Sequence, residues 1–315
     1  MTDERMFRVV KRYYLLKENQ DTIARAEKIS KSTISRLLKK AEQMGYVRHV
    51  IDVPLSYCDE LEIELSKCFD LTLARVLPAE SENEQIALFD VVLAAGQYLN
   101  QMIQSGDVVG VTWGNTMRAF AESLPECTRK LRNVKVVQLN GSVSRRVTPT
   151  YGDRVVRRIA DSYDGEGYVI PAPSFADTPE MRDLLMQDST IRSYFNLIDQ
   201  CRIALFGIGA LSRNSVLIQA GYISSGQYDY LRSQRFCGDI CSRYIKRDGS
   251  YVEDELYNRV IGISLDAIKL IPEKIGLVVG EGKAAAALAA LRGGFITHLF
   301  IDERSAKRVL ELVRQ

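Results

Sequence analysis

Long apolar segments are absent from this 315-residue sequence. No apolar run reaches the roughly 18 residues that a membrane-spanning helix needs, and the first four residues lack the basic and apolar regions of a secretion signal. We therefore expect a cytoplasmic protein with no membrane partner. Apolar residues make up 46% and charged residues 26% of the chain, so disorder, collagen and coiled coil are excluded. The length predicts two domains.

Residues that build metal and disulfide sites are scarce as well. The six cysteines include no Cys-x-x-Cys pair, and the two histidines, His49 and His298, lie far apart in the chain. We therefore expect neither a metal site nor a cofactor. Cys237 and Cys241 are four residues apart and could share a helix face, but in a reducing cytosol the simpler interpretation is buried thiols without a function.

Charge is distributed unevenly along the chain. Residues 1–50 contain twelve lysines and arginines against six acids, a net charge of +6, which leaves −4 for the remainder of a chain whose total is +2. A basic head on a mildly acidic body is typical of a head that contacts phosphates. The alternative at this point is a solvated basic face.

The head is predicted to form three helices. After Ser30, a plausible N-cap, apolar residues recur with helical spacing as far as Gly45, a plausible stop. A short helix capped by Asp21 is expected before it, and a longer one from Met6 to Leu16 comes first. The short break at residues 28–30 predicts a helix-turn-helix unit within a DNA-binding domain of residues 1–54.

The third helix of such a unit lies in the major groove of double-stranded operator DNA. The side chains opposite its apolar face are the candidate DNA contacts. We expect base contacts from Ser32, Thr33 and Arg36, with Ser35 on the same face, and phosphate contacts from Lys31, Lys39 and Lys40. The β-branched residues 46–53 predict the strand of a short wing, with Arg48 reaching the DNA backbone. If the head is instead a helical dimerisation cap, it has no salt-dependent DNA affinity.

The body, residues 55–315, alternates strands and helices. Seven short, β-rich stretches are bounded by Gly, Pro or Asp; they are residues 73–77, 108–113, 134–139, 167–170, 203–208, 275–279 and 298–301. This alternation predicts an α/β fold of βαβ units on a largely parallel, Rossmann-like sheet. Ligands of such sheets bind beyond the carboxyl ends of the strands, so the loops there are the candidate site.

Several of these loops contain small or charged residues suited to a ligand. The loop at Gly114, Asn115 and Thr116 enters a helix expected at 117–124, where backbone amides suit an anion, although a tight turn needs glycine anyway. Further small-residue loops are found at 140–144 and 207–210. Asp239 follows a glycine, and Lys283 stands at the start of an alanine-rich helix, where it opposes the helix dipole. An acid, a lysine and amide-lined loops can hold the hydroxyls and phosphate of a small sugar; the alternative for Lys283 is an exposed residue without a role.

Four stretches, at 34–38, 106–114, 238–243 and 291–294, occur in an order that resembles the SorC family of bacterial sugar-responsive transcription regulators. Within it the chain looks closest to the deoxyribonucleoside-regulator and phospho-autoinducer-regulator branches. The resemblance implies a helix-turn-helix head, a sugar-phosphate-isomerase-like α/β domain that binds a phosphorylated sugar, and a homodimer or homotetramer. It also implies phosphate contacts at Gly114, Asn115 and Thr116, a hydroxyl-binding acid at Asp239, and a phosphate- or hydroxyl-binding lysine at Lys283.

Two departures from the family pattern change what is expected. Where the deoxyribonucleoside branch has a lysine that forms a Schiff base, this chain has Asn140, in a loop with Gly141 and Ser142 that we include in the effector site. An amide forms no imine, so effector binding is expected to be non-covalent. In the head, Glu27 and Lys28 replace a leucine and a small turn residue of the family pattern. The resemblance therefore does not predict the conformation of the turn between the second and third helices.

The sequence therefore predicts a transcription regulator, a repressor of a carbohydrate or nucleoside catabolic operon, and not an enzyme. The alternative is a sugar-phosphate isomerase or deaminase-like enzyme with a nucleic-acid-binding head. Such chemistry needs a general base over the sugar carbons. Asp239 is the only candidate base in these loops, so that alternative rests on fold analogy.

Overall fold

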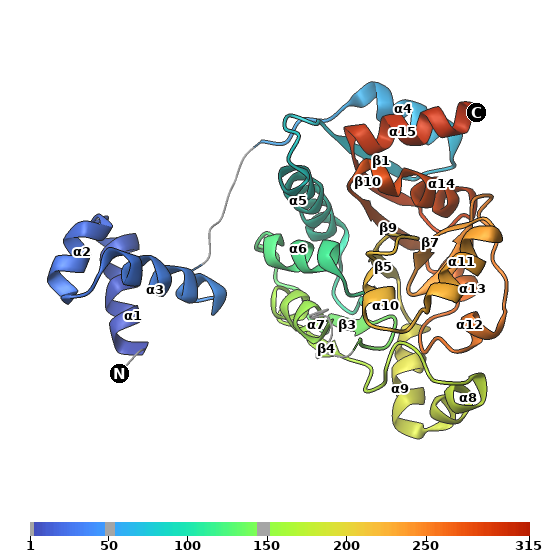
Figure 1. The fold of residues 1–315 in the computed structure, drawn as a ribbon, viewed down its shortest axis with the longest axis horizontal. Coiled ribbons are helices and arrows are strands. Elements are labelled where there is room, and N and C mark those ends of the chain that lie inside the picture. Colours follow the sequence, from blue (N-terminus) through green and yellow to red (C-terminus); the bar gives the residue numbers. More distant parts are fainter. Residues whose placement is uncertain (1–2, 48–53, 144–151) are drawn as a thin grey trace. The chain divides into compact units, whose positions relative to one another are not determined.

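The computed structural model describes residues 3–47, 54–143 and 152–315 (Figure 1). The chain divides into two compact units, residues 1–53 and 54–315. The predicted wing falls mostly outside the described residues, and with it the DNA contact expected from Arg48. Of that stretch only Tyr46 and Val47 are described, and they form a bend rather than a strand.

The first unit consists of three helical segments around a small core. They are α1 (Asp3–Val10), which continues as a π-helical segment (Lys11–Leu15), α2 (Gln20–Glu27) and α3 (Lys31–Gln43). The apolar residues predicted to line one face of the third helix are buried, except Met44 at its end, and they pack on α1 and α2. Ser30 accepts a hydrogen bond from the Thr33 N–H and is the N-cap of α3, as expected.

The start of α2 differs from the prediction. Asn19, not Asp21, is the N-cap, since its Oδ1 accepts the Thr22 N–H at 2.9 Å. Asp21 lies two residues after the N-cap, within the first turn of α2, and forms an ion pair with Lys31 at 2.9 Å. At the other end of α2, Lys28 adopts a left-handed conformation with φ of +54°, which turns the chain toward α3 without a glycine.

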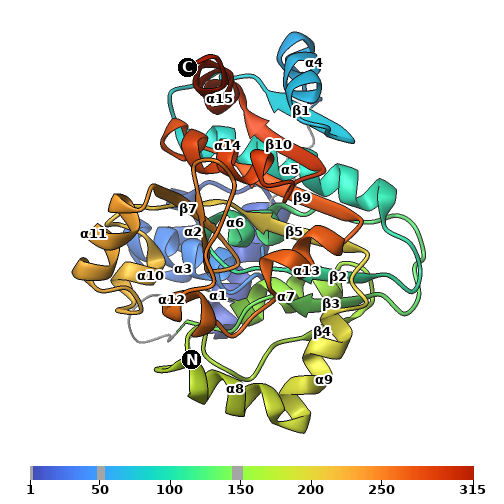
Figure 2. The same cartoon turned by 90° about the vertical axis from the view of Figure 1, so that its right-hand side faces the viewer.

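The second unit is built on a seven-stranded, wholly parallel sheet. Its order is β1-β10-β9-β5-β2-β3-β4, visible in Figure 2. The strands are β1 (Leu73–Leu77), β2 (Val108–Val111), β3 (Lys135–Gln138), β4 (Glu166–Tyr168), β5 (Ile203–Gly207), β9 (Glu273–Val278) and β10 (His298–Asp302). Each coincides, within a few residues, with one of the seven predicted strands, so the prediction of a parallel sheet is confirmed.

Helices cover both faces of this sheet (Figure 1). One face carries α5 (Glu84–Met102), α6 (Asn115–Ser123) and α7 (Gly152–Asp161). The other carries α4 (Asp59–Cys68), α9 (Ser189–Ile198), α13 (Leu265–Leu270), α14 (Ala284–Arg292) and α15 (Glu303–Arg314). Burial of the sheet on both faces explains why its central strands are nearly continuous apolar runs rather than alternating ones.

A smaller antiparallel sheet lies beside the main one. It consists of β6 (Gly209–Ala210), β7 (Phe236–Ile240) and β8 (Arg243–Lys246). Around it lie the short helices α10 (Val216–Gln219), α11 (Ser225–Ser233) and α12 (Glu255–Asn258), whereas α8 (Pro179–Gln187) lies beside α9 (Figure 1). Cys237 therefore lies on a strand and Cys241 in the β7–β8 turn, so the shared helix face considered for them is wrong. In the described part of the chain, no helix has both the length and the apolar character to cross a membrane.

Candidate ligand site and basic helix face

The carboxyl ends of the central strands bring the predicted loops to one edge of the sheet. The chain runs outward from β2 to β4 on one side and from β5 to β10 on the other, so the order reverses between β2 and β5. Such a reversal is where α/β sheets hold their ligands. The end of β5 lies against the first turn of α6, because a Cβ atom placed on Gly207 would lie 3.3 Å from the Thr116 Cβ.

The loop after β2 presents the start of α6. Gly114, its N-cap residue, has φ of +123° and ψ of 174°, a conformation open only to glycine. Asn115 is exposed, whereas the Thr116 side chain is buried. The first N–H groups of a helix have no hydrogen-bond partner within the helix. At this edge of the sheet, the first N–H groups of α6 can therefore donate hydrogen bonds to an anion.

The loop after β3 is held mainly by the protein itself. Gly141 donates its N–H to the Ile261 carbonyl at 2.8 Å and accepts the Trp113 Nε1–H at 2.8 Å. A Cβ at Gly141 would lie 2.1 Å from the Pro173 carbonyl oxygen, so glycine is required by packing. The Ser142 hydroxyl accepts from Gln138 Nε2 at 3.3 Å. Gly141 therefore shapes the loop, and its amide is already bonded.

Asn140, in the same loop, is buried, and only one of its two side-chain polar atoms has a hydrogen-bond partner. Its Nδ2 donates to the Ser242 hydroxyl at 3.0 Å. Its Oδ1 has no hydrogen-bond partner among the described residues, although the side chain is 2% exposed. Buried amide oxygens are almost always bonded, so this atom is a candidate ligand contact.

Asp239 lies on β7, not in a loop as the sequence analysis expected, and it interacts electrostatically with Lys283. Asp239 lies against β6, where a Cβ on Gly209 would come within 2.0 Å of its Oδ1. Burial raises the pKa of Asp239 to about 6, opposed by the Ser242 N–H and by the charge of Lys283. Burial lowers the pKa of Lys283, opposed by Glu84, Asp239 and Asp302. Lys283 ends a 3₁₀ turn (Glu281–Lys283) and is partly buried, so the alternative of an exposed lysine does not hold.

Replacing Asp239 with asparagine should stabilise the free protein at alkaline pH. The folded pKa of about 6 lies above the ordinary value, so the charged carboxylate costs stability above pH 6 and the cost disappears as the pH falls toward 4. We expect Asp239→Asn to raise the free energy of unfolding by about 2–3 kcal/mol at pH 8 and by little at pH 4. Urea unfolding followed by the fluorescence of Trp113, the single tryptophan, measures this.

The matched control for this substitution is Asp229→Asn. Asp229 is exposed and pairs with exposed Arg213, so its replacement should change stability little at either pH. A loss of stability at pH 8 in Asp239→Asn would mean that the hydrogen bond from the Ser242 N–H outweighs the burial of the charge.

Three further residues of this edge were not predicted. Asp302, the last residue of β10, accepts the Gly280 N–H at 2.9 Å and so shapes the loop that carries Lys283. Glu84 stands at the start of α5, close to Gly280. Ser242 lies within the stretch 238–243 that carries the family resemblance, so the sequence did contain a signal that could have identified it. Nothing local in the sequence marks Glu84, because its contact is with a residue almost two hundred positions away.

The exposed face of α3 carries most of the predicted DNA contacts. Ser32, Ser35, Arg36, Lys39 and Lys40 are exposed and Thr33 is partly buried. None of the ion pairs found within residues 3–47 uses Arg36, Lys39 or Lys40. Lys31 is paired with Asp21, and the Ser32 and Thr33 hydroxyls both contact the Ser30 hydroxyl. Three free cations therefore line this face.

A metal centre receives no support from the described part of the chain, which contains no group of three or more His, Cys, Asp or Glu side chains able to hold an ion.

Comparisons with known proteins define the class. A family model described as "Putative sugar-binding domain" matches residues 53–311. The crystal structure of the full-length sorbitol operon regulator SorC from Klebsiella pneumoniae superposes with a TM-score of 0.76, at 26% identity, over 98% of this chain and 99% of that one. The fold is thus that of a transcriptional regulator with a mixed α/β sugar-binding domain.

Two curated relatives lead to the same class. The deoxyribonucleoside regulator of Bacillus subtilis is 28% identical over 95% of this chain and 94% of its own. The transcriptional regulator LsrR of Klebsiella pneumoniae is 29% identical over 98% and 94%. This chain belongs to the SorC family of sugar-responsive transcriptional regulators, as its four sequence stretches predicted.

Proposed function

We propose that this protein is a cytoplasmic DNA-binding repressor of a carbohydrate or nucleoside catabolic operon, controlled by non-covalent binding of a phosphorylated sugar. The observation that carries the proposal is the proximity of Asp239 and Lys283 near the strand-order reversal, where the end of β5 lies against the start of α6. A carboxylate suits sugar hydroxyls, and a lysine beside helix amides suits a phosphate.

Each predicted effector residue takes one part in this site. The Gly114, Asn115 and Thr116 amides, with Lys283, bind the phosphate, and Asp239 and Ser142 bind hydroxyls. Asn140 offers its unpaired Oδ1 to a ligand donor, and Gly141 keeps the loop in place. An amide at position 140 forms no imine, which supports reversible, non-covalent binding.

For the first unit we propose a helix-turn-helix whose recognition helix is α3. Arg36 reads a base edge with Ser32, Thr33 and Ser35 beside it, and Lys39 and Lys40 hold phosphates. Lys31 reaches a phosphate only by releasing Asp21, because the two side chains are paired. Arg48 stays a proposed backbone contact outside the described residues.

We further propose that effector binding changes how the protomers of a homodimer or homotetramer pack. This change alters the spacing between two α3 helices that bind the two operator half-sites. To shift the DNA-competent population from 99:1 to 1:99, the effector must prefer the other state by about 5.5 kcal/mol. The enzymatic alternative rests on fold analogy, and the relatives are named as regulators.

Fluorescence anisotropy tests the proposal. DNA from upstream of the protein's own gene is titrated with the full chain, and then with phosphorylated pentoses, hexoses, alditols and linear ketoses. Release of DNA by one compound is the expected result. Tight, salt-sensitive binding that no compound alters would contradict the effector class, and the absence of DNA binding would favour an enzyme.

Replacing Arg36 with alanine should weaken operator binding and reduce its sequence preference. The guanidinium is exposed and unpaired on α3, so the free protein loses nothing, whereas a bidentate contact to guanine is worth about 1–3 kcal/mol. Anisotropy with operator and scrambled DNA measures the change. Lys11→Ala removes an exposed cation outside α3 and should have a small, sequence-independent effect. Unchanged operator affinity in Arg36→Ala would show that α3 does not read the DNA.

A further inference from the structure

A pocket with a volume of about 130 Å³ lies beside β1, the edge strand of the main sheet. Its lining comes from β1, β10, α5 and the segment that precedes α4, and consists of Tyr57, Arg75, Ala94, Gln97, Tyr98, Gln101 and Phe300. None of these residues belongs to the proposed effector site. The pocket is therefore a candidate for a separate ligand.

Much of the pocket wall is apolar and aromatic. Phe300 is 1% exposed and Ala94 is 2% exposed. Tyr98 packs on Phe300 with the ring centroids 5.7 Å apart, and Tyr57, which is 37% exposed, adds a third ring. A cavity of about 150 Å³ is enough to hold benzene. A pocket of this size with aromatic walls therefore suits a single planar ring.

Arg75 is the charged residue of the lining. Its Nη1 donates to Glu62 Oε2 at 2.7 Å, and its guanidinium lies over the Tyr57 ring, 5.1 Å from the centroid. No hydrogen bond among the described residues uses its Nε or Nη2. These two nitrogens present parallel N–H donors, the arrangement that binds a carboxylate at both oxygens. Arg75 can therefore hold Glu62 with one nitrogen and a ligand carboxylate with the other two.

The remaining polar residues of the pocket are compatible with an anion. Gln97 and Gln101 stand about one turn apart on α5, and their amides can donate to a ligand oxygen. Among the described residues, no acid lines the pocket. The Glu62 carboxylate is already bonded to Arg75 and, at 2.9 Å, to the Val76 N–H. A ligand with one negative charge therefore meets a cation and amide donors.

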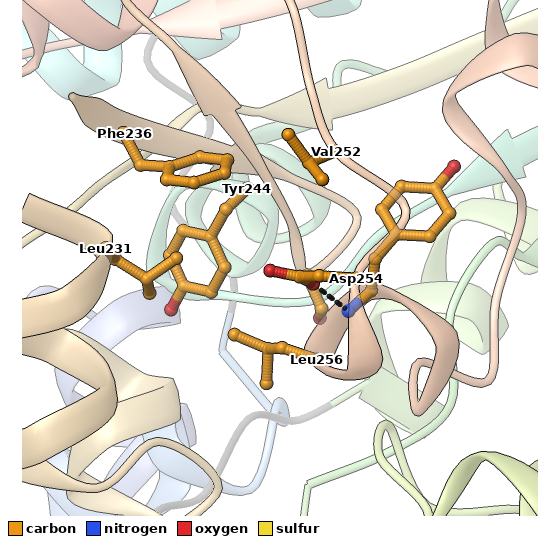
Figure 3. A pocket seen from close by; sticks show the side chains of 8 residues that line it. Leu231, Phe236, Tyr244, Val252, Asp254 and Leu256 are labelled. Carbon is orange, nitrogen blue, oxygen red and sulfur yellow. Dashed lines mark hydrogen bonds between the residues drawn. The ribbon is translucent and has the colours of Figure 1, made fainter. Parts of the chain in front are cut away.

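A pocket on the β7–β8 hairpin offers no comparable space (Figure 3). Leu231, Phe236 and Tyr244 are part of its lining, as is Asp254, which accepts the Tyr257 N–H at 2.9 Å, the dashed line of the figure. Its volume of about 10 Å³ is that of a single water molecule. The Tyr244 hydroxyl is buried and has no hydrogen-bond partner among the described residues, but this pocket is too small for an organic ligand.

We propose that the pocket beside β1 binds a small aromatic carboxylate, with its ring among Tyr57, Tyr98 and Phe300 and its carboxylate on Nε and Nη2 of Arg75. This site is additional to the effector site and does not depend on the function proposed above. Tyr57 is the fourth residue of the second unit. The next residue, Cys58, donates its N–H to the Val76 carbonyl at 2.9 Å, which holds this segment on the edge of β1. The ligand therefore contacts the segment through which the chain enters the second unit.

Calorimetry and ligand-observed NMR of the full chain with benzoate, benzamide and acetate test the proposal. Benzoate and benzamide have the same ring and nearly the same volume, but only benzoate has a charge for Arg75. We expect benzoate to bind about tenfold more tightly than benzamide. Acetate, which lacks the ring, should not compete with benzoate. Equal binding of benzoate and benzamide, competition by acetate, or no binding of benzoate at millimolar concentrations would overturn the proposal.

Substitutions then locate the ligand. Arg75→Lys keeps a charge for Glu62 but lacks the planar fork, so benzoate affinity should fall about five- to tenfold. Tyr57→Ala removes one aromatic wall and should lower the affinity by a similar factor. Arg213→Lys is the matched control, because Arg213 also pairs with an acid, Asp229, at 2.8 Å and lies over a tyrosine ring at 4.6 Å, but it is not part of this pocket. Unchanged affinity in both test variants, or an equal loss in the control, would overturn the assignment.

Lys283→Met separates this site from the effector site. The variant should bind benzoate as the original chain does, while Arg75→Lys should keep the response of operator binding to phosphorylated sugars. Loss of benzoate binding in Lys283→Met, or displacement of benzoate by a phosphorylated sugar, would place benzoate in the effector site and overturn the proposal. Either result would leave the proposed function intact.

Discussion

Replacing Lys283 with methionine should abolish the response to phosphorylated sugars and leave operator affinity unchanged. Lys283 is the basic side chain that meets Asp239, and its pKa is lowered by burial. A charge-assisted contact to phosphate in such surroundings is worth about 3 kcal/mol, so effector affinity should fall about 100-fold or more. Anisotropy of preformed operator complex, titrated with the effector, measures the loss.

The same substitution should not harm the free protein. A lysine whose folded pKa is lowered is less favourable when charged in the fold than in water. Methionine keeps the apolar stem, so the free energy of unfolding at pH 7 should stay the same or rise. Lys130→Met, at an exposed lysine, is the matched control and should leave the effector response intact. Simultaneous loss of operator binding and effector response in Lys283→Met would refute its assignment as an effector contact.

Arg243→Met should destabilise the second unit by about 3–5 kcal/mol. The guanidinium is 1% exposed and donates to the carbonyl groups of Tyr257, Gly262 and Ile263 at 2.7, 3.1 and 2.7 Å. It also lies over the Tyr257 ring, 4.1 Å from its centroid. Removing the donors leaves several buried carbonyl groups unpaired, and each costs about 1–3 kcal/mol, part of which relaxation recovers.

Urea unfolding of the full chain, followed by Trp113 fluorescence, measures this loss. Arg243→Lys keeps the charge but lacks the planar fork, so it should recover only part of the stability. Arg247→Met, at an exposed arginine just beyond β8, should have little effect. If Arg243→Met is as stable as the original chain, the segment 257–263 is held by its own packing.

Arg243 also bears on the ligand site. The segment 257–263, whose carbonyl groups accept hydrogen bonds from Arg243, pairs with the loop after β3. Gly262 forms an antiparallel bridge with Asn140, and the Ile261 carbonyl accepts the Gly141 N–H. A Cβ on Gly262 would lie 2.9 Å from the Asn140 Cβ, so the two segments are in close contact. Stability and effector affinity are therefore expected to decrease together in Arg243→Met.

The sequence by itself determined the strands of the main sheet, the helices of the first unit and their order along the chain, but not the antiparallel sheet β6-β7-β8. Most strands of the main sheet are short apolar, β-rich runs bounded by Gly, Pro or Asp, and α3 has a helical spacing of apolar residues. These signals are local, so they can be read along the chain. The cap of α2 shows the limit of such signals, since Asn19 and Asp21 are both good capping residues and only the backbone geometry separates them.

Only the tertiary structure decided what surrounds the site. Asp239 and Lys283 are each visible in the sequence, but their proximity, and that of Glu84 and Asp302, depends on which strand ends share an edge. Likewise, the Tyr244 hydroxyl is unpaired, and Arg243 clamps carbonyl groups, because of segments that fold against the hairpin from elsewhere in the chain. Burial and pKa values depend on neighbours distant in sequence, which no local pattern records.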